Sequence, residues 1–450
     1  MCGIFGVYKD LNQEKADKAI ALLKHRGSSF KLINEKNKIL CHILHPVVNH
    51  VQQPLMSKSS VFMANCEIYN WKTLNEKYSC SAKNDAECLF QLLEKKGIAA
   101  LEEIDGVYAL YYEKDNIVIL ARDILGEKPL CYVHTKDIFA FASEAKALTA
   151  YGTPVHLPPD EVLYYDSEKH AIQIKKRQFF TIPKETKELK QEILQKLEKY
   201  LIEAVKKRVD GLDNVGILFS GGIDSTIVAF LCKKLGKKVT CYTAGFHDGN
   251  TREAPDITQA EYVAKKLGFS LKSVILNLKK TESLIPEVVR IIESRDVVKV
   301  GVALPFYCAA ELAKHDKQKV LLSGLGSEEL FAGYQRHALA ENVNQECLSG
   351  LTLLWERDLY RDDLITMAHT VELRLPFLDN TLIAYALSIP AEYKISEKQN
   401  KIILRDLAVK LGIPEEIAMQ KKIAAQYGSN FDKALEKLGK GKKREYLKKI

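Results

Sequence analysis

The stretch at residues 216–230, GILFSGGIDSTIVAF, constrains the fold more than any other part of the sequence. An apolar run ends at Ser220, two glycines follow, and a helix-like pattern resumes beyond Asp224 and Ser225. Glycines allow a ligand to approach the main chain closely, and the N–H groups at the start of the next helix favour an anion. The spacing is not that of a Walker loop, because no lysine follows the glycines. We therefore expect a pyrophosphate-binding turn here, in preference to a plain strand-to-helix turn capped by serine.

Apolar runs and helical patterns alternate on both sides of this turn. Strand-like runs occur at 215–219, 237–246 and 319–324, and a helical pattern follows each of them. Strict alternation of strand and helix predicts a doubly wound parallel sheet, whose ligands bind beyond the carboxyl ends of the strands. We assign residues 189–450 to this α/β domain and expect a long amphipathic helix to begin at Leu189.

The first part of the chain has a different pattern. Residues 107–122 contain two strand-like runs separated by EKDN, which predicts a β-hairpin. A helical pattern runs from Asp85 to Gly97, where Asp85 can cap the start and Gly97 the end. We predict a mixed α+β sheet domain over residues 2–165 and a polar linker over 166–188.

The overall composition excludes several classes of protein. No run approaches the ~20 apolar residues of a membrane span, so we expect no membrane partner. Much of the net charge of +8 lies in the C-terminal stretch KALEKLGKGKKREYLKKI, which we interpret as a solvated tail, and we expect no nucleic-acid partner. The ten cysteines are scattered without C-x-x-C pairs, which indicates reduced thiols and a cytoplasmic protein. The sequence leaves a homodimer open.

Cys2 follows the initiator methionine directly, and a side chain this small allows that methionine to be removed. An N-terminal cysteine would carry both a thiol nucleophile and an α-amine of pKa ~8 that can accept the thiol proton. A cysteine at this position by chance is the alternative, and the dipeptide alone does not decide between the two.

Motifs spread along the chain resemble those of one known family. In the first half these are MCGIFG, HRG (25–27), NCEIYN (65–70), RDILGEKPL (122–130) and FASEAKAL (141–148). In the second half they are SGGIDS, SGLGSEELFAGY (323–334), MAHTVELRLPFLD (367–379) and KKIAAQYGS (421–429). Their identity and order resemble the glutamine-hydrolysing asparagine synthetases, and most of all the subgroup called asparagine synthetase domain-containing proteins.

This resemblance implies an N-terminal-nucleophile glutaminase domain followed by an ATP-pyrophosphatase-type synthetase domain. A member of the family hydrolyses glutamine at its N-terminal cysteine and passes ammonia through an internal tunnel. At the second site Mg-ATP adenylates the side-chain carboxylate of aspartate, and ammonia then displaces AMP to give asparagine. The implied substrates are glutamine or ammonia, aspartate and ATP, and the implied metal ion is Mg²⁺.

The resemblance also implies roles for residues of the glutaminase half. Cys2 would attack the glutamine amide, while Asn65 and the main-chain N–H of Cys66 would stabilise the oxyanion. The residues implied in glutamine binding are Asn65, Cys66, Glu67 and Asp85.

In the synthetase half the resemblance implies a nucleotide site and a metal site. The residues implied in ATP binding are Phe219, Ser220, Gly221, Gly222, Asp224, Ser225, Ala244, Ser323 and Gly324. Asp224 and Glu328 would hold Mg²⁺, and Lys422 would steady charge during adenylation and amidation. We expect a structural role, as an ion-pair network, for Glu372, Arg374 and Asp379.

Several positions differ from the usual residues of the family around its small substrates. They are Ser28, Leu44 and Cys66 in the first half, and Gly301, Ala303, Leu304 and Leu325 in the second. Leu44 replaces an arginine that clamps the glutamine α-carboxylate, and loss of such a contact costs ~1.5–3 kcal/mol. The apolar changes in the second half are expected to reshape the acceptor pocket. They leave two alternatives open: an adenylating ligase for another carboxylate with weak or lost glutaminase activity, and a non-catalytic scaffold that binds ATP.

Overall fold

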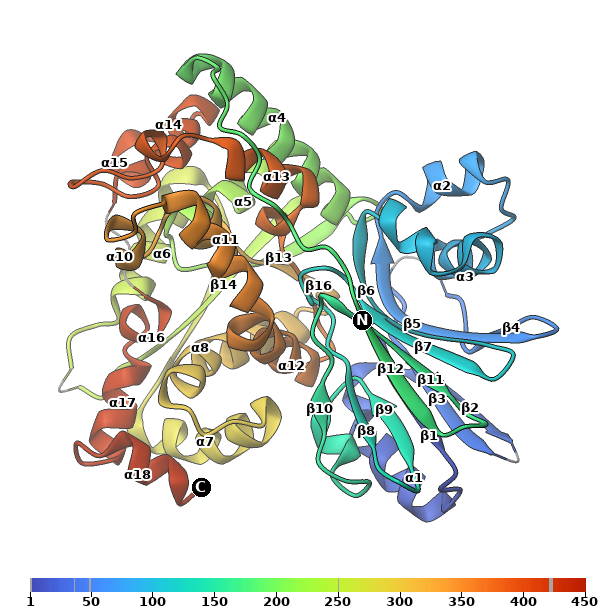
Figure 1. The fold of residues 1–450 in the computed structure, drawn as a ribbon. Coiled ribbons are helices and arrows are strands. Elements are labelled where there is room, and N and C mark those ends of the chain that lie inside the picture. Colours follow the sequence, from blue (N-terminus) through green and yellow to red (C-terminus); the bar gives the residue numbers. More distant parts are fainter. Residues whose placement is uncertain (1, 36, 48–49, 250, 421–423) are drawn as a thin grey trace. The chain divides into compact units, whose positions relative to one another are not determined.

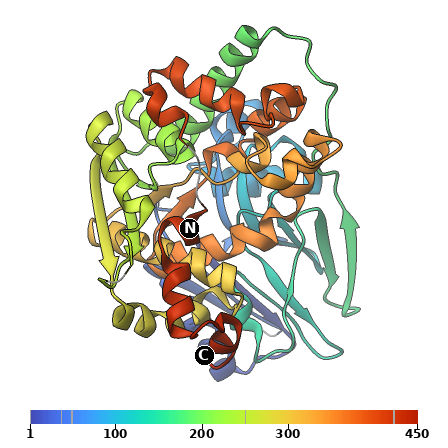
Figure 2. The same ribbon diagram turned by 90° about the vertical axis from the view of Figure 1, so that its left-hand side faces the viewer.

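The computed structural model describes residues 2–35, 37–47, 50–249, 251–420 and 424–450 (Figures 1 and 2). The chain divides into two compact units, residues 1–179 and 180–450. Each unit has its own sheets and its own hydrophobic core. Among these residues no helix is long and apolar enough to cross a membrane.

Two six-stranded sheets form the centre of the first unit, as far as its residues are described. Their strand orders are β10-β8-β9-β1-β3-β2 and β12-β11-β7-β6-β5-β4, and neighbouring strands are antiparallel. The strands are β1 (Gly3–Tyr8), β2 (Ser29–Glu35), β3 (Lys38–Leu44), β4 (Leu55–Met56), β5 (Ser60–Ile68), β6 (Gly106–Lys114), β7 (Ile117–Arg122), β8 (Cys131–His134), β9 (Phe139–Ala142), β10 (Val155–His156), β11 (Glu161–Asp166) and β12 (Ala171–Lys176). The helices are α1 (Gln13–Ala21), α2 (Trp71–Lys77) and α3 (Asp85–Lys96).

The alternation of side chains along β5 explains how these layers form. Val61 and Met63 belong to a core cluster that includes Phe141 of the other sheet. Phe62 and Ala64 belong to a second cluster, with side chains of α2 and α3. Because successive side chains of a strand point to opposite faces, β5 is apolar on both. Helices α2 and α3 therefore cover one face of this sheet (Figure 1), and the predicted α+β sheet domain is confirmed.

Two details differ from the sequence-based expectations. The cap of α3 is Asn84, whose Oδ1 accepts the N–H of Glu87 at 2.9 Å, and Asp85 is the first helical residue instead of the predicted cap. The reason is that the Asp85 carboxylate bonds to the N–H of Ile68 at 3.0 Å, away from the helix. The segment predicted as a linker, 166–188, contains strand β12, which pairs with β11 in the second sheet.

A five-stranded parallel sheet, counted over the described residues, forms the centre of the second unit, in the order β15-β14-β13-β16-β17. The strands are β13 (Asn214–Leu218), β14 (Lys238–Phe246), β15 (Ser270–Leu276), β16 (Val320–Leu322) and β17 (Glu372–Arg374). The helices include α4 (Lys190–Val209), α5 (Ile223–Lys234), α6 (Pro255–Leu267), α7 (Leu278–Ile292), α8 (Val297–His315), α9 (Ser327–Leu330), α10 (Gln335–Ala338), α11 (Val343–Leu354), α12 (Tyr360–Ala368), α13 (Asn380–Ser388), α14 (Ile402–Leu411) and α17 (Phe431–Leu438). The predicted doubly wound α/β fold is confirmed.

The strand order reverses direction at β13. From there the chain builds outward through β14 and β15 on one side, and later through β16 and β17 on the other. The loops that follow β13 and β16 therefore leave neighbouring strands in opposite directions and open a crevice at the carboxyl edge of the sheet. This crevice is where the fold itself places a ligand.

Two helical features line the region beyond that edge. Helix α8 buries Val300, Ala303 and Leu304 in a core cluster with Phe246 of β14. A π-helical turn at Trp355–Leu359 joins α11 to α12 without a break. A π-turn adds one residue to a helix and often marks a functional site.

Candidate active sites

The main chain of Cys2 is held from two sides in the first unit. Its N–H donates to Asn65 Oδ1 at 2.9 Å, and its carbonyl accepts from Arg26 Nε at 3.1 Å. Arg26 is fully buried and donates through a second nitrogen to Glu144 at 2.6 Å. Burial alone would raise the pKa of Glu144, but the bond with His25 and the charge of Arg26 hold that pKa well below its usual range. Arg26 and Glu144 thus form a buried ion pair that anchors Cys2.

The side-chain oxygen of Asn65 accepts the N–H of Cys2, while its side-chain nitrogen, Nδ2, is a hydrogen-bond donor that no described residue uses. Asn65 lies on β5, fully buried, and its Nδ2 has no hydrogen-bond partner among the described residues. The preceding residue, Ala64, is fixed because Gln53 bonds both its N–H (2.7 Å) and its carbonyl (3.2 Å). A buried N–H donor left without a partner is costly, so its presence beside Cys2 fits a site where an oxyanion forms.

Cys66, Glu67 and Asp85 gather at the end of β5. Cys66 Sγ donates to Asp85 Oδ2 at 3.7 Å, and the other oxygen of Asp85 accepts the N–H of Ala86 at 2.9 Å. Burial, together with the neighbouring Asp85 and Cys2, raises the pKa of the Cys66 thiol well above its usual value. Cys66 therefore stays protonated. Glu67 follows it on the strand and is half-buried.

Leu44 occupies the last position of β3 and is buried. Its carbonyl accepts the N–H of Ser28 at 2.9 Å, which places two of the departures from the family pattern in direct contact. The position that carries a charged clamp in typical family members is therefore an apolar, buried one here.

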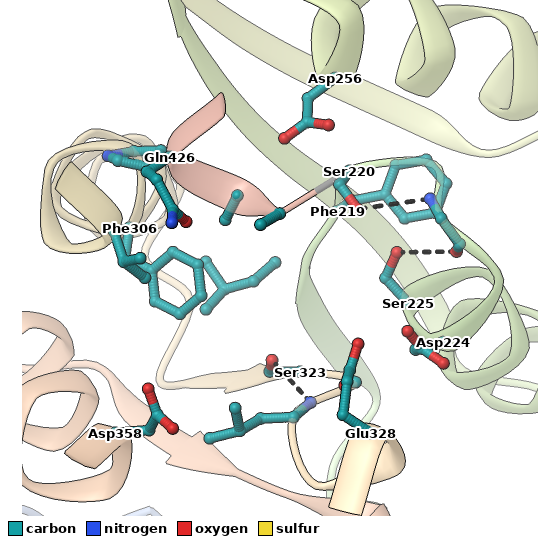
Figure 3. A pocket seen from close by; sticks show the side chains of 18 of the residues that line it. Phe219, Ser220, Asp224, Ser225, Asp256, Phe306, Ser323, Glu328, Asp358 and Gln426 are labelled. Carbon is teal, nitrogen blue, oxygen red and sulfur yellow. Dashed lines mark hydrogen bonds between the residues drawn. The ribbon is translucent and has the colours of Figure 1, made fainter. Parts of the chain in front are cut away.

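A cavity of about 770 Å³ opens in the second unit at the crevice between β13 and β16 (Figure 3). The residues of the predicted ATP and metal sites that line it are Phe219, Ser220, Gly222, Asp224, Ser225, Ala244, Ser323, Gly324 and Glu328. Helix α5 begins after Gly222 with no side-chain cap, so its first N–H groups are available to an anion. Ser225 Oγ donates to the carbonyl of Gly222 at 3.2 Å, and Ser220 Oγ accepts the N–H of Gly222 at 3.3 Å.

Two glycines allow the loops of this crevice to pack. Gly221 is outside the cavity lining; it has a φ of +71°, and a Cβ on it would lie 2.8 Å from the main chain of Gln259. A Cβ on Gly324 would lie 2.6 Å from the Cβ of Asp224. Neither position accepts a side chain without displacing its neighbour, which explains the glycines better than ligand approach alone.

The carboxylates of Asp224 and Glu328 converge on a lysine that the sequence motifs do not reveal. Lys401 Nζ donates to both oxygens of Asp224 at 2.7 Å, to Glu328 Oε1 at 3.0 Å and to Ser327 Oγ at 2.9 Å. Lys401 is 1% exposed. Two carboxylates that meet at one cation form the hard oxygen donor set that Mg²⁺ prefers, and Mg²⁺ usually adds phosphate oxygens and water to it. The residues present therefore fit a magnesium ion.

Only one of the positions expected to reshape the acceptor pocket, Leu325, lines the cavity. Ala303 and Leu304 lie in the core cluster behind α8, and Gly301 packs against Gln426. The face of α8 that lines the cavity is formed instead by Val298, Lys299, Val302, Pro305, Phe306 and Ala309. The reason is the helical period, which turns residues 301, 303 and 304 away from the face that carries 298, 302 and 306.

The remaining predicted residues of the second unit are Lys422 and the expected ion-pair network. Lys422 lies outside the described residues. Glu372, Arg374 and Asp379 form buried ion pairs: Arg374 with Glu372 (2.8 Å), and Asp379 with Arg208 (3.1 Å). Arg374 also donates to the carbonyl of Arg208 at 2.9 Å, so the network braces α4 against β17.

The fold and the two sites define a class of protein: an N-terminal-nucleophile amidotransferase unit joined to a nucleotide-binding unit of ATP-pyrophosphatase type. Residues 1–198 match the family model described as a glutamine amidotransferase domain, and residues 196–347 and 338–440 match the model described as asparagine synthase. The chain belongs to the asparagine synthase family.

Relatives align along nearly the whole chain. A Methanocaldococcus jannaschii protein, provisionally named glutamine-hydrolyzing asparagine synthetase 1, is 34% identical, with 98% of this chain and 96% of the relative covered. The Escherichia coli protein named asparagine synthetase B is 28% identical, with 94% and 81% covered. The human asparagine synthetase is 29% identical, with 95% and 84% covered.

Proposed function

We propose that this chain makes asparagine from aspartate, with glutamine as nitrogen donor and with ATP converted to AMP and pyrophosphate. The observation that carries the proposal is the crevice between β13 and β16, where an uncapped helix start lies next to the converging carboxylates of Asp224 and Glu328. That arrangement suits the pyrophosphate of a nucleotide with its metal ion. The site around Cys2 and Asn65 supplies a matching source of ammonia.

In the first unit, Cys2 is the nucleophile that attacks the glutamine amide. Once Met1 is removed, the α-amine of Cys2 accepts the thiol proton, and Asn65 Oδ1 holds that amine in place. The oxyanion that forms is stabilised by Asn65 Nδ2 and the N–H of Cys66. Asp85 and Glu67 supply the negative charge that binds the α-ammonium group of glutamine.

In the second unit, the serines and N–H groups of residues 220–225 hold the phosphates of ATP. Asp224 and Glu328 would hold Mg²⁺, which would supply charge neutralisation at the phosphates. The side-chain carboxylate of aspartate attacks the α-phosphorus; the new C–O–P bond forms as pyrophosphate leaves. Ammonia then attacks the activated carbonyl, and AMP leaves with the former carboxylate oxygen. Lys422 is the cation that steadies charge during these steps, while Lys401 holds the two carboxylates in place.

The decisive experiment is exchange of labelled pyrophosphate into ATP, since it isolates adenylation from glutamine hydrolysis. We expect exchange that requires aspartate and magnesium and that is lost in Asp224→Asn. Asparagine formation should follow with ammonia, and with glutamine only while Cys2 is intact. No exchange with aspartate at saturating Mg-ATP would disprove the proposed function, because every later step depends on the adenylate.

A further inference from the structure

The end of the cavity away from the pyrophosphate loop carries a set of charged side chains. Figure 3 shows Asp224 and Ser225 on one side of the cavity and Phe306 and Asp358 on the other. Arg357 and Arg361 pair with Asp358, Lys299 bonds the carbonyl of Glu356, and Arg336 and Arg357 both lie near the Tyr334 ring. The charged lining residues in this neighbourhood are therefore Lys299, Arg336, Arg357, Asp358 and Arg361. The π-helical turn Trp355–Leu359 supplies two of them.

Two of these arginines have their charge balanced inside the protein. Arg357 donates to Asp358 at 2.6 Å and also pairs with Glu329. Arg361 is 4% exposed and donates to Asp358 at 3.0 Å and to Asp362 at 2.7 Å. The pairs of Arg361 are buried and structural, because breaking them would leave an uncompensated charge. Arg357 is 34% exposed, and two carboxylates hold its guanidinium.

Arg336 has a different environment. Its side chain is 40% exposed, and the nitrogen that pairs with Glu346 Oε1, at 2.7 Å, is Nε. Its guanidinium lies 4.3 Å from the centre of the Tyr334 ring, and a Cβ on Gly350 would lie 3.2 Å from its Nη2. The ion pair and the ring contact orient the guanidinium, and the absence of a side chain on Gly350 leaves room for it. In the described part of the chain its two terminal nitrogens have no hydrogen-bond acceptor.

A planar guanidinium held in this way is suited to bind a carboxylate with two parallel N–H donors. Apolar side chains of Val302, Phe306 and Leu325 line the same cavity. Lys299, the remaining cation, donates to the main-chain carbonyl of Glu356 at 2.9 Å.

We propose that Arg336 binds the α-carboxylate of the acceptor amino acid and thereby selects aspartate. The proposal rests on the proposed function, since it names a contact to the substrate of that reaction. The side-chain carboxylate of the same molecule points toward the pyrophosphate loop, where it is adenylated. Arg336 is therefore a specificity-determining residue of the acceptor end of the cavity.

The test compares aspartate with two analogues in the pyrophosphate exchange assay, as substrates or as competitive inhibitors. Succinate lacks the α-amine, and β-alanine lacks the α-carboxylate but keeps the carboxylate that would react. In Arg336→Gln we expect the KM for aspartate to rise about 10- to 100-fold. The KM of succinate, or its inhibition constant if it only inhibits, should rise by a similar factor. The KM or inhibition constant of β-alanine should stay the same, and so should the KM for ATP. Arg336→Lys should recover part of the loss.

Arg290→Gln is the matched control, because it makes the same substitution at an exposed arginine of α7 that is not among the residues lining the cavity. It should leave the KM for aspartate within about twofold of the wild-type value. An equal rise for aspartate and β-alanine in Arg336→Gln would show that the arginine only shapes the pocket and would overturn the proposal. An unchanged KM for aspartate would overturn it too. If the wild-type enzyme shows no exchange with aspartate, the proposed function has failed first, so the two failures are distinguishable.

Discussion

The ammonium group of Lys401 lies 2.7 Å from both carboxylate oxygens of Asp224, a residue 177 positions earlier in the chain. It also lies 3.0 Å from Glu328 Oε1. The first turn of α5, helix α9 and the residue before α14 therefore meet at one buried cation. This lysine balances two carboxylates that would otherwise repel each other in the interior.

Replacement of Lys401 by Met should destabilise the second unit. Removal of one partner from a buried ion pair costs about 3–5 kcal/mol, because the remaining charge is uncompensated. We expect a lower thermal midpoint that Mg²⁺ raises more in the variant than in the wild type, since the metal can replace the lost cation. Lys410→Met removes an exposed partner of Glu198 and should change stability by less than about 1 kcal/mol. Equal midpoints for Lys401→Met and wild type would contradict the balancing role.

Gly324→Ala should impair the use of ATP. The new Cβ would lie 2.6 Å from the Cβ of Asp224 and 2.9 Å from the nitrogen of Ser225, so the two loops of the crevice must separate. Overpacking of this kind costs about 1–3 kcal/mol, and we expect a raised KM for ATP in the exchange assay. Gly301→Ala is the control, since its Cβ meets only side chains, Gln426 at 3.2 Å and Leu435 at 3.8 Å. Similar KM values for the two variants would refute the steric explanation.

Asn65→Asp should separate the two functions of this side chain. An aspartate keeps an oxygen that can accept from the Cys2 nitrogen but lacks the Nδ2 donor. Loss of one oxyanion donor lowers kcat about 10²–10³-fold, so glutaminase activity should fall by that factor. Ammonia-dependent asparagine synthesis, measured on the same samples, should be retained. A glutaminase rate within threefold of wild type would exclude Nδ2 as an oxyanion donor.

Leu44→Arg should improve the binding of glutamine. A charge-assisted contact to the α-carboxylate contributes about 1.5–3 kcal/mol, so the KM for glutamine should fall about 10- to 100-fold. The rate with ammonia should not change, which provides an internal control for folding. If the KM for glutamine is unaffected, the buried end of β3 does not face the glutamine site.

Acidification should destabilise the first unit through His42. Burial lowers the pKa of His42 from 6.5 to about 4, and its Nε2 lies 3.2 Å from the carbonyl of Ala64, next to Asn65. Between these two pH values the unfolded chain holds the proton and the folded chain does not. The free energy of unfolding should therefore fall by about 3 kcal/mol as the pH drops from 6.5 to 4.

The measurement uses Trp71 fluorescence in a Trp355→Phe background, so that the signal reports on the first unit. His42→Gln removes the titrating group and keeps a side-chain amide that can donate to the same carbonyl. Its unfolding should lose less stability on acidification than that of the parent. A constant difference between the two proteins across this pH range would show that His42 does not control the acid response.

The sequence predicts a strand or helix well where burial of one or both of its faces leaves a clear pattern of apolar residues. The two strand-like runs around EKDN predict the hairpin of β6 and β7 in the first unit, and GILFSGGIDS predicts the turn at the centre of the second. Strand β17 was missed because two of its three residues, Glu372 and Arg374, are charged, whereas the equally short β16 is entirely apolar. The cap of α3 was misassigned because Asn84 and Asp85 are both good caps, and only the contact to Ile68 decides between them.

The candidate sites show the same limit. Lys401 has no motif around it, and its partners come from distant segments, so sequence reasoning did not find it. Arg26 and Glu144 had a signal, since they lie within HRG and FASEAKAL, but only the structure shows that they pair and hold Cys2. The lining of the acceptor pocket was wrong for Gly301, Ala303 and Leu304 because the register of α8 against the sheet decides which residues face inward.

The π-helical turn at Trp355–Leu359 limits where the chain can accept insertions and deletions. Each residue of an α-helix advances the chain by about 100° around the axis. Deletion of one residue within the turn would restore a regular helix but rotate Arg357 and Asp358 relative to α12, away from the cavity that they line. Single-residue insertions and deletions should therefore be far less tolerated here than substitutions, and homologues that lack the extra residue should have a different acceptor end.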